Sequence, residues 1–179
     1  AIVSRDISDL EVAGRIVLPG VGAFRDAVEA IRDLGLEAPL RHYALDVRKP
    51  ILGVCLGMQL LANTSTEYGR HKGLGWIDAD VIPLKNSSVD KVPHVGWSNI
   101  EITGSEWLFE GLPENPDFYF VHSFHMVCAN QSDVIASSTH NGGITAAVAH
   151  KNIVATQFHP EKSQDNGLRI LGNWLNREF

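Results

Sequence analysis

Cys55 lies at a corner where a short apolar run, residues 51–54, gives way to a helical pattern over residues 56–61. Gly53 and Gly57 flank it two residues away on either side. This is the spacing of a nucleophile elbow, a strand-to-helix turn too tight for β-carbons at its flanks. Such a turn lifts one side chain above the sheet edge, where the first free N–H groups of the helix favour a thiolate and can hold a negative oxygen. Cys55 is therefore a candidate nucleophile.

A nucleophilic cysteine needs a base, because a cysteine between apolar residues is also typical of an ordinary packed core. His159 and Glu161 directly follow a strand pattern at residues 153–158, and Pro160 between them stiffens the turn. If this strand lies beside the elbow strand, His159 can take the Cys55 proton and later protonate a leaving amine. Glu161 would then fix the imidazole tautomer and support its charged form. The alternative is a surface turn with two solvated side chains.

The first half of the chain alternates strand and helix patterns, which is typical of a parallel sheet with helices on both faces. A buried-strand run at residues 15–18 ends in a glycine-rich corner at 19–22, and helices are expected over residues 24–34 and 36–47. Ligands of such sheets bind beyond the C-terminal ends of the strands. The glycine-rich corner and the elbow both lie at such ends.

The second half of the chain contains strand patterns in succession, which predicts an antiparallel extension of the parallel sheet. The expected architecture is a three-layer α/β/α domain. A hairpin turn is expected at residues 141–142, because an Asn-Gly step there precedes a strand pattern. The expected segments are strands at 75–84, 95–102, 118–127 and 144–149, a loop at 63–73, an unburied polar segment at 87–91, a helical turn at 105–109 and an amphipathic helix over 168–175.

Length, charge and cysteine content are those of one soluble domain spanning residues 1–179. With 44% hydrophobic and 20% charged residues, the chain can bury a core without disulfides or metals. The net charge is −6 and basic residues do not cluster, so neither nucleic acid nor a membrane is an expected partner. Cys55 and Cys128 follow no disulfide or zinc spacing, which suggests a reducing, cytoplasmic setting and no metal site. Neither a signal peptide nor a membrane-spanning segment is expected.

Three segments, taken in order, resemble the signatures of the class I, or triad, glutamine amidotransferases. They are Pro-Gly-Val-Gly at residues 19–22, Gly-Val-Cys-Leu-Gly-Met-Gln at 53–59 and Phe-His-Pro-Glu at 158–161. The resemblance implies a flavodoxin-like fold and a triad of Cys55, His159 and Glu161. Such a triad hydrolyses the side-chain amide of glutamine to glutamate and ammonia, and no cofactor is expected.

The same resemblance implies an oxyanion hole made of backbone N–H groups. Its donors would be Leu56 and either Val21 or Gly22. Removal of one such donor typically slows an enzyme about 10²- to 10³-fold, so this corner matters as much as the acid-base residues.

A closer resemblance, spanning essentially the whole chain, is to the glutaminase subunits of imidazole glycerol phosphate synthases. It rests on Met-Gln at residues 58–59, Pro-His-Val-Gly-Trp at 93–97, Tyr-Phe-Val-His-Ser-Phe at 119–124 and His-Pro-Glu-Lys-Ser-Gln at 159–164. Such a subunit forms a heterodimer with a (β/α)₈-barrel cyclase, and ammonia passes through that barrel in histidine biosynthesis.

The closer resemblance also assigns roles to individual residues. Trp97 and Lys162 would face the cyclase partner, although Trp97 is open to a place in the core and Lys162 to simple solvation. The residues implied in glutamine binding are Gly22, Gln59, His122, Ser123 and Phe124.

The start of the chain and the use of its chemistry leave other interpretations open. The resemblance implies that the chain should open with a strand and a glycine-rich loop leading into a helix. This unit, about 30 residues by the usual size of a strand-helix crossover, has no counterpart here, which suggests a truncated chain. Ammonia could also serve another synthase. A third possibility is a non-catalytic sensor whose elbow cysteine reacts covalently or by oxidation, although the intact residues 159–161 argue against it.

Overall fold

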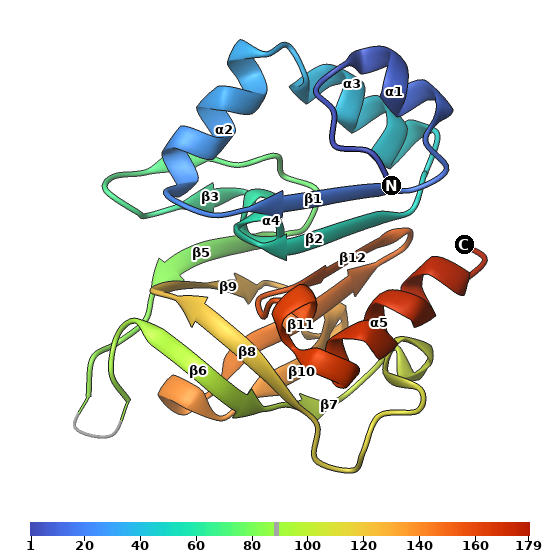
Figure 1. Cartoon of the computed structure of the whole chain (residues 1–179). Helices are drawn as coiled ribbons and strands as arrows, with labels where there is room; N and C mark the ends of the chain where they lie inside the picture. The colour runs from blue at the N-terminus through green and yellow to red at the C-terminus, as the bar shows by residue number, and fades with distance from the viewer. Residues whose placement is uncertain (88–89) are drawn as a thin grey trace.

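A six-stranded mixed sheet forms the centre of the computed structural model, which describes residues 1–87 and 90–179 (Figure 1). Three neighbouring strands run parallel, and the remaining three follow antiparallel. The expected parallel sheet with an antiparallel extension is therefore confirmed. In spatial order the strands are β1 (Ile16–Gly20), β2 (Ile51–Cys55), β12 (Ile153–Thr156), β11 (Ile144–His150), β10 (Val134–Ser138) and β7 (Glu101–Ile102).

Two smaller sheets accompany the central one and correct three of the expectations. The four-stranded sheet has the order β4 (His71–Lys72), β3 (Thr64–Ser65), β5 (Ala79–Pro83) and β9 (Phe124–Cys128), and the two-stranded sheet pairs β6 (His94–Asn99) with β8 (Asp117–His122). The expected loop at 63–73 contains β3 and β4. The expected strand at 118–127 is divided at Ser123 into β8 and β9, which belong to different sheets. The expected strand at 95–102 is divided into β6 and β7 in the same way.

The helical segments largely follow the sequence pattern. The expected helix over 36–47 is an α-helix that continues as a π-helix, and the expected helical turn and C-terminal helix are both present. The helices are α1 (Ile7–Val12), α2 (Phe24–Asp33), α3 (Glu37–Arg41), η1 (His42–Asp46), α4 (Leu56–Leu60), η2 (Glu106–Phe109), η3 (Gln131–Asp133), η4 (His140–Gly142), η5 (Pro160–Lys162) and α5 (Gln164–Asn176).

Two hydrophobic cores cover the two faces of the central sheet, because successive side chains of a strand point to opposite faces. Ile51 of β2 packs with Phe24 of α2 in one core. The next residue, Leu52, packs with Trp174 of α5 in the other. Figure 1 shows α1, α2 and α3 grouped on one side of the sheet and α5 on the other. The expected three-layer architecture is confirmed.

Two further expectations concern turns and polar segments. The hairpin between β10 and β11 turns through Asn141, whose φ of +57° is the left-handed conformation that asparagine tolerates. Of the polar segment 87–91, residues 88–89 lie outside the described residues. Within the described residues, no helix combines the length and the apolar character needed to cross a membrane.

Candidate active site

Cys55 ends β2 in a strained conformation, with φ +52° and ψ −108°. A non-glycine residue rarely adopts a positive φ, and such residues cluster at functional sites. The flanking glycines explain how the turn fits. A β-carbon on Gly57 would lie 1.7 Å from the carbonyl oxygen of Leu18, and one on Gly53 would lie 3.0 Å from the Ala155 β-carbon. The sequence prediction of a tight elbow around Cys55 is confirmed.

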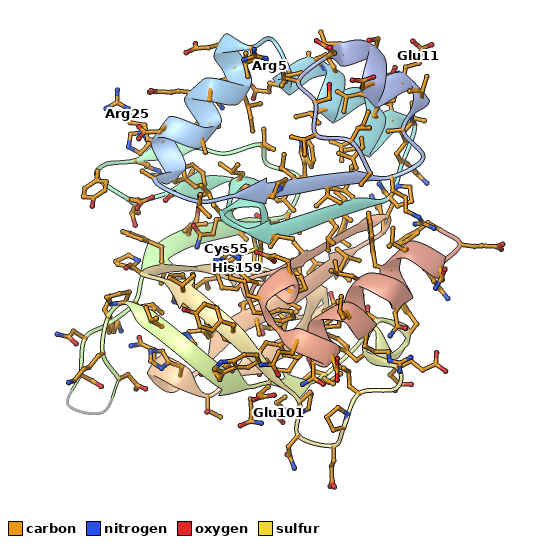
Figure 2. All side chains as sticks on the ribbon, in the orientation of Figure 1. Arg5, Glu11, Arg25, Cys55, Glu101 and His159 are labelled. Atoms are coloured by element: carbon orange, nitrogen blue, oxygen red, sulfur yellow. The ribbon has the colours of Figure 1, made fainter. Side chains whose placement is uncertain are left out.

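Parallel pairing brings three strand ends to one edge of the sheet. Gly20 at the end of β1 is the register partner of Cys55, and Val54 is the partner of Thr156 at the end of β12. The expectation that the elbow strand lies beside the strand before His159 is therefore correct. Figure 2 shows Cys55 and His159 close together where β2 ends, and both line one cavity.

His159 is 2% exposed and has a defined tautomer. Its Nδ1 lies 2.7 Å from Oε1 of Glu161, and a carboxylate only accepts hydrogen bonds, so Nδ1 carries the proton. The other ring nitrogen, Nε2, is buried and has no hydrogen-bond partner among the described residues. The backbone N–H of His159 donates to the carbonyl of Tyr119 at 2.9 Å, which fixes the position of the turn on β8. His159 is thus held with a free basic nitrogen inside the protein.

The sulfur of Cys55 is a thiol at neutral pH. Burial raises the pKa of Cys55 to about 11, against the opposing hydrogen bonds from the Leu56 backbone and the Gln157 side chain. The thiol donates to the carbonyl oxygen of Val121 at 3.8 Å and accepts from Nε2 of Gln157 at 3.7 Å. Its proton therefore points toward β8, and reaction requires the proton to move to His159.

A cavity of about 280 Å³ opens beside Cys55. The structure brings every residue predicted for the oxyanion hole and for glutamine binding to this cavity, together with Cys55 and His159. Glu161 is placed one hydrogen bond away, on His159. The lining residues are Val21, Gly22, Cys55, Leu56, Gln59, Glu67, Pro93, Val121, His122, Ser123, Phe124 and His159.

Gln59 is buried at the cavity wall and braces it internally. Its Nε2 donates to the carbonyl of Phe124 at 2.9 Å and to Oε1 of Gln157 at 3.0 Å. The Phe124 carbonyl also accepts from Nδ1 of His122 at 2.8 Å. Both hydrogens of the Gln59 amide are therefore used within the protein, and the one on the Phe124 carbonyl helps to fix the segment from His122 to Phe124.

Sequence reasoning missed two residues of the site, Glu67 and Gln157. Oε2 of Glu67 accepts a 2.7 Å hydrogen bond from the backbone of Phe24, at the start of the helix that follows the glycine-rich corner. It also places a carboxylate in the cavity. No local pattern marks Glu67, which lies in a polar segment. Gln157 did carry a signal, because it is a polar residue that interrupts a buried apolar strand pattern two positions before His159.

Neither of the residues predicted to face a partner lines the cavity, although the charge of Lys162 lowers the pKa of Cys55 against the effect of burial. Trp97 on β6 is 44% exposed and contacts the ring of Tyr119 edge-on at 6.0 Å, so it is not a core residue. Lys162 is exposed at the end of η5. Val95 and Val121, which are register partners on β6 and β8, are also exposed. We call Val95, Trp97 and Val121 the outer apolar patch.

No cluster of metal ligands accompanies the site in the part of the chain that the structure describes. Among residues 1–87 and 90–179, no group of three or more histidine, cysteine, aspartate or glutamate side chains is arranged to hold a metal ion. The reactive groups at the cavity are a thiol and an imidazole hydrogen-bonded to a carboxylate.

Curated relatives resemble the chain over almost its whole length. It is 47% identical to the imidazole glycerol phosphate synthase subunit HisH 2 of Nitrobacter winogradskyi, over 98% of this chain and 85% of that protein. It is 44% identical to the imidazole glycerol phosphate synthase subunit HisH of Sulfurimonas denitrificans, over 97% of this chain and 84% of that protein.

Solved structures give the same fold. A glutamine amidotransferase crystal structure superposes with a TM-score of 0.72 at 21% identity, over 96% of this chain and 84% of that one, a likeness of fold alone. A putative GMP synthase subunit from Thermoplasma acidophilum gives a TM-score of 0.66 at 27% identity, over 95% and 75% of the two chains. The family model described as glutamine amidotransferase class-I matches residues 2–177. The chain belongs to the class I glutamine amidotransferase family.

Proposed function

We propose that this chain is the glutaminase subunit of an imidazole glycerol phosphate synthase. It hydrolyses glutamine to glutamate and ammonia and passes the ammonia to a cyclase subunit in histidine biosynthesis. The observation that carries the chemistry is the buried Nε2 of His159, which has no hydrogen-bond partner among the described residues. The His159 ring is oriented by Glu161 and lines the same cavity as the strained Cys55. The similarity to the relatives named HisH supports imidazole glycerol phosphate synthase as the enzyme that uses the ammonia.

The reaction begins with proton transfer from the Cys55 thiol to Nε2 of His159. The thiolate attacks the side-chain carbonyl carbon of glutamine, and a tetrahedral intermediate forms. The imidazolium returns the proton to the nitrogen as the C–N bond breaks, so ammonia leaves and a γ-glutamyl thioester remains. Water, deprotonated by His159, then attacks the thioester and releases glutamate, and the thiol is restored.

Glu161 supports both proton transfers. Its carboxylate holds the tautomer with Nδ1 protonated and stabilises the imidazolium that forms twice in each turnover. The Glu161 side chain is 52% exposed, so water screens part of this charge. Glu161 therefore contributes both the orientation of the ring and a partly screened charge.

The negative oxygen of the tetrahedral intermediate is held by backbone N–H groups in this proposal. Leu56 directly follows the elbow, and its N–H already acts on the Cys55 sulfur. The second donor is the N–H of Val21 or Gly22, in the corner that borders the cavity. Gly22 has φ +102°, a conformation open to glycine, and the Val21 side chain is 80% exposed. A corner so lightly packed can turn its N–H groups, so we expect partner docking to complete the oxyanion hole.

The cyclase partner is proposed to dock on the outer apolar patch. Exposed aromatic side chains such as that of Trp97 are enriched among the residues that anchor protein interfaces. Val121 belongs both to this patch and to the active site, because its carbonyl oxygen accepts a hydrogen bond from the Cys55 thiol. The free thiols Cys55 and Cys128 suit the reducing cytoplasm in which we place the complex.

The test is glutamate release from glutamine, measured for the chain alone and with a cyclase subunit loaded with its nucleotide substrate. We expect low activity alone, strong stimulation by the loaded partner, and complete loss in Cys55→Ala. Unchanged stimulated activity in Cys55→Ala would overturn the mechanism. Stimulation by a different synthase, but not by the cyclase, would redirect the ammonia to that enzyme.

A glutamine-analogue electrophile separates this enzyme from a cysteine sensor. We expect the reagent to label Cys55 alone, with glutamine protecting it, because the cavity binds glutamine beside the nucleophile. Labelling of Cys55 without protection by glutamine would favour the sensor instead. Peptide mapping by mass spectrometry distinguishes Cys55 from Cys128.

A further inference from the structure

Gln157 lies against the nucleophile and is completely buried, with 0% exposure. Its Nε2 lies 3.7 Å from the sulfur of Cys55, within hydrogen-bond distance for a sulfur acceptor. Its Oε1 lies 3.0 Å from Nε2 of Gln59. Both the nitrogen and the oxygen of this buried amide are hydrogen-bonded, so the Gln157 side chain is held in one position in the site. The mechanism above gives it no role.

The orientation of this amide follows from a backbone anchor. The carbonyl oxygen of Phe124 only accepts hydrogen bonds, so the Gln59 atom 2.9 Å from it must be the donor nitrogen. That nitrogen has a second hydrogen, which faces the Gln157 side chain and requires the oxygen of Gln157 there. The N–H₂ group of Gln157 is then left pointing at the Cys55 sulfur. A flipped Gln157 would bring two N–H₂ groups together.

We propose that Gln157 is a catalytic residue, whose amide N–H stabilises the Cys55 thiolate formed when His159 accepts the proton. This inference rests on the proposed function only for the identity of the reaction. A hydrogen bond to a charged acceptor is roughly twice as strong as one to a neutral acceptor, so the contact strengthens as the thiol ionises. The opposite contact, from the thiol to the Val121 carbonyl, is lost at that moment, because a thiolate has no hydrogen to donate.

The surroundings make such a donor necessary. Burial disfavours a charged sulfur, and the Cys55 side chain lies in an apolar core with little access to water. Leu56 N–H, which also acts on the sulfur, is required for the oxyanion once attack begins. Gln157 is a side-chain donor that remains on the sulfur throughout, and Gln59 is the positioning residue that aims it.

The first experiment measures the rate of Cys55 alkylation by iodoacetamide at pH 9, followed by mass spectrometry of the peptide that contains it. The rate below the thiol pKa is proportional to the thiolate fraction. Gln157→Met keeps a similar shape without an N–H group, and we expect alkylation about tenfold slower. A merely structural role predicts the reverse, since a loosened site exposes the sulfur. A Gln157→Met rate equal to or faster than that of the unaltered chain would overturn the proposal.

A matched control is Thr156→Val at the end of β12, next to Gln157, which removes a buried hydroxyl and its 3.0 Å hydrogen bond to the Phe158 carbonyl. The lost hydrogen bond does not involve Cys55. We therefore expect Thr156→Val to lower the stability of the protein and to leave the alkylation rate of Cys55 unchanged. Equal slowing in Thr156→Val and Gln157→Met would overturn the proposal, because it would assign the effect to strand damage.

A second variant, Gln157→Glu, guards against failure of Gln157→Met to fold. Above its own pKa the new carboxylate still accepts from Gln59 but has no hydrogen for the sulfur. We expect slower alkylation and a lower kcat with the KM for glutamine nearly unchanged. A rate of alkylation as fast as in the unaltered chain would contradict the role. Because alkylation needs no glutamine turnover, absence of glutaminase activity in the unaltered chain would overturn the proposed function without affecting this result.

Discussion

The imidazole of His94 donates from Nδ1 to Nε2 of His122 across 2.9 Å. The direction is set by Nδ1 of His122, which must donate to the Phe124 carbonyl at 2.8 Å and leaves Nε2 as an acceptor. Nε2 of His94 in turn accepts from the Ser98 hydroxyl at 2.8 Å. Both rings are therefore neutral, and this chain of hydrogen bonds braces the cavity wall at His122. Burial lowers the pKa of His94 to about 4 and that of His122 to about 3.

These two histidines make the protein sensitive to acid. Their pKa values in the folded state lie below the ordinary 6.5, so the folded chain binds fewer protons than the unfolded chain between these limits. The contribution of these two histidines to the free energy of unfolding is therefore at its full value above about pH 7. It falls as the pH drops from 6.5 toward 4. For His94 alone the loss is about 3 kcal/mol. Urea unfolding at pH 7, 5.5 and 4 measures it.

Substitution of His94 tests this assignment. His94→Asn should be less stable at pH 7 yet lose less stability on acidification, because one titrating group is gone. Ser98→Ala is the control, since it removes a hydrogen bond to His94 and leaves both histidines to titrate. The assignment fails if His94→Asn and Ser98→Ala show the same slope against pH.

Replacement of Glu161 should slow the reaction without weakening glutamine binding. The amide introduced by Glu161→Gln still accepts from Nδ1 of His159 but carries no charge to support the imidazolium. We expect kcat to fall about 10- to 100-fold, less than for a fully buried carboxylate because Glu161 is half exposed. Partner-stimulated glutamate release gives kcat and KM, and the exposed Glu114→Gln is the control. A wild-type kcat in Glu161→Gln would remove Glu161 from the triad.

Two glycine-to-alanine substitutions should move stability in opposite directions. A β-carbon at Gly57 would lie 1.7 Å from the Leu18 carbonyl oxygen, so Gly57→Ala must displace the elbow from β1. We expect a loss of at least about 3 kcal/mol in the free energy of unfolding, together with loss of activity. Gly172, within α5, has open space around it, and Gly172→Ala should gain about 1 kcal/mol. Denaturant unfolding of both variants checks the contrast, and equal stability of the two would refute it.

Truncation of Trp97 should weaken the partner without changing the isolated chain. Its ring is 44% exposed and contacts Tyr119 edge-on, so Trp97→Ala removes exposed surface of the proposed docking patch rather than core. We expect about 30-fold weaker binding of the cyclase subunit, typical of a central aromatic residue, with unchanged Cys55 alkylation. Leu34→Ala, at the C-terminal end of α2, removes an equally exposed apolar side chain elsewhere and serves as the control. Affinity unchanged in Trp97→Ala would place the docking surface elsewhere.

The reactive residues were predictable because their signals are local. The spacing of Gly53, Cys55 and Gly57 predicts a tight strand-to-helix turn with no room for β-carbons at its two flanks, and the structure confirms this turn. The position of His159 required one assumption, that β12 lies next to β2, which alternating strands and helices made reasonable.

The supporting contacts were harder to predict because their partners are remote in sequence. The chain bends at Ser123, but no glycine or proline marks the change of sheet there, so the division into β8 and β9 had no local sign in the sequence. Glu67 bonds to Phe24, 43 residues away, and a polar segment gives no indication of such a partner. Gln157 stood out only as a buried polar residue, whose use depends on Gln59, 98 residues away.

Val121 belongs both to the outer apolar patch and to the wall of the cavity beside Cys55. Its side chain faces outward on β8, and its carbonyl oxygen engages the thiol proton. A partner that shifts β8 enough to release this proton favours its transfer to His159. Thermodynamic reciprocity then sets the return effect: whatever factor the docked partner adds to the affinity for glutamine, bound glutamine adds to the affinity for the partner. If that factor exceeds one, bound glutamine tightens the complex with the proposed partner by the same factor.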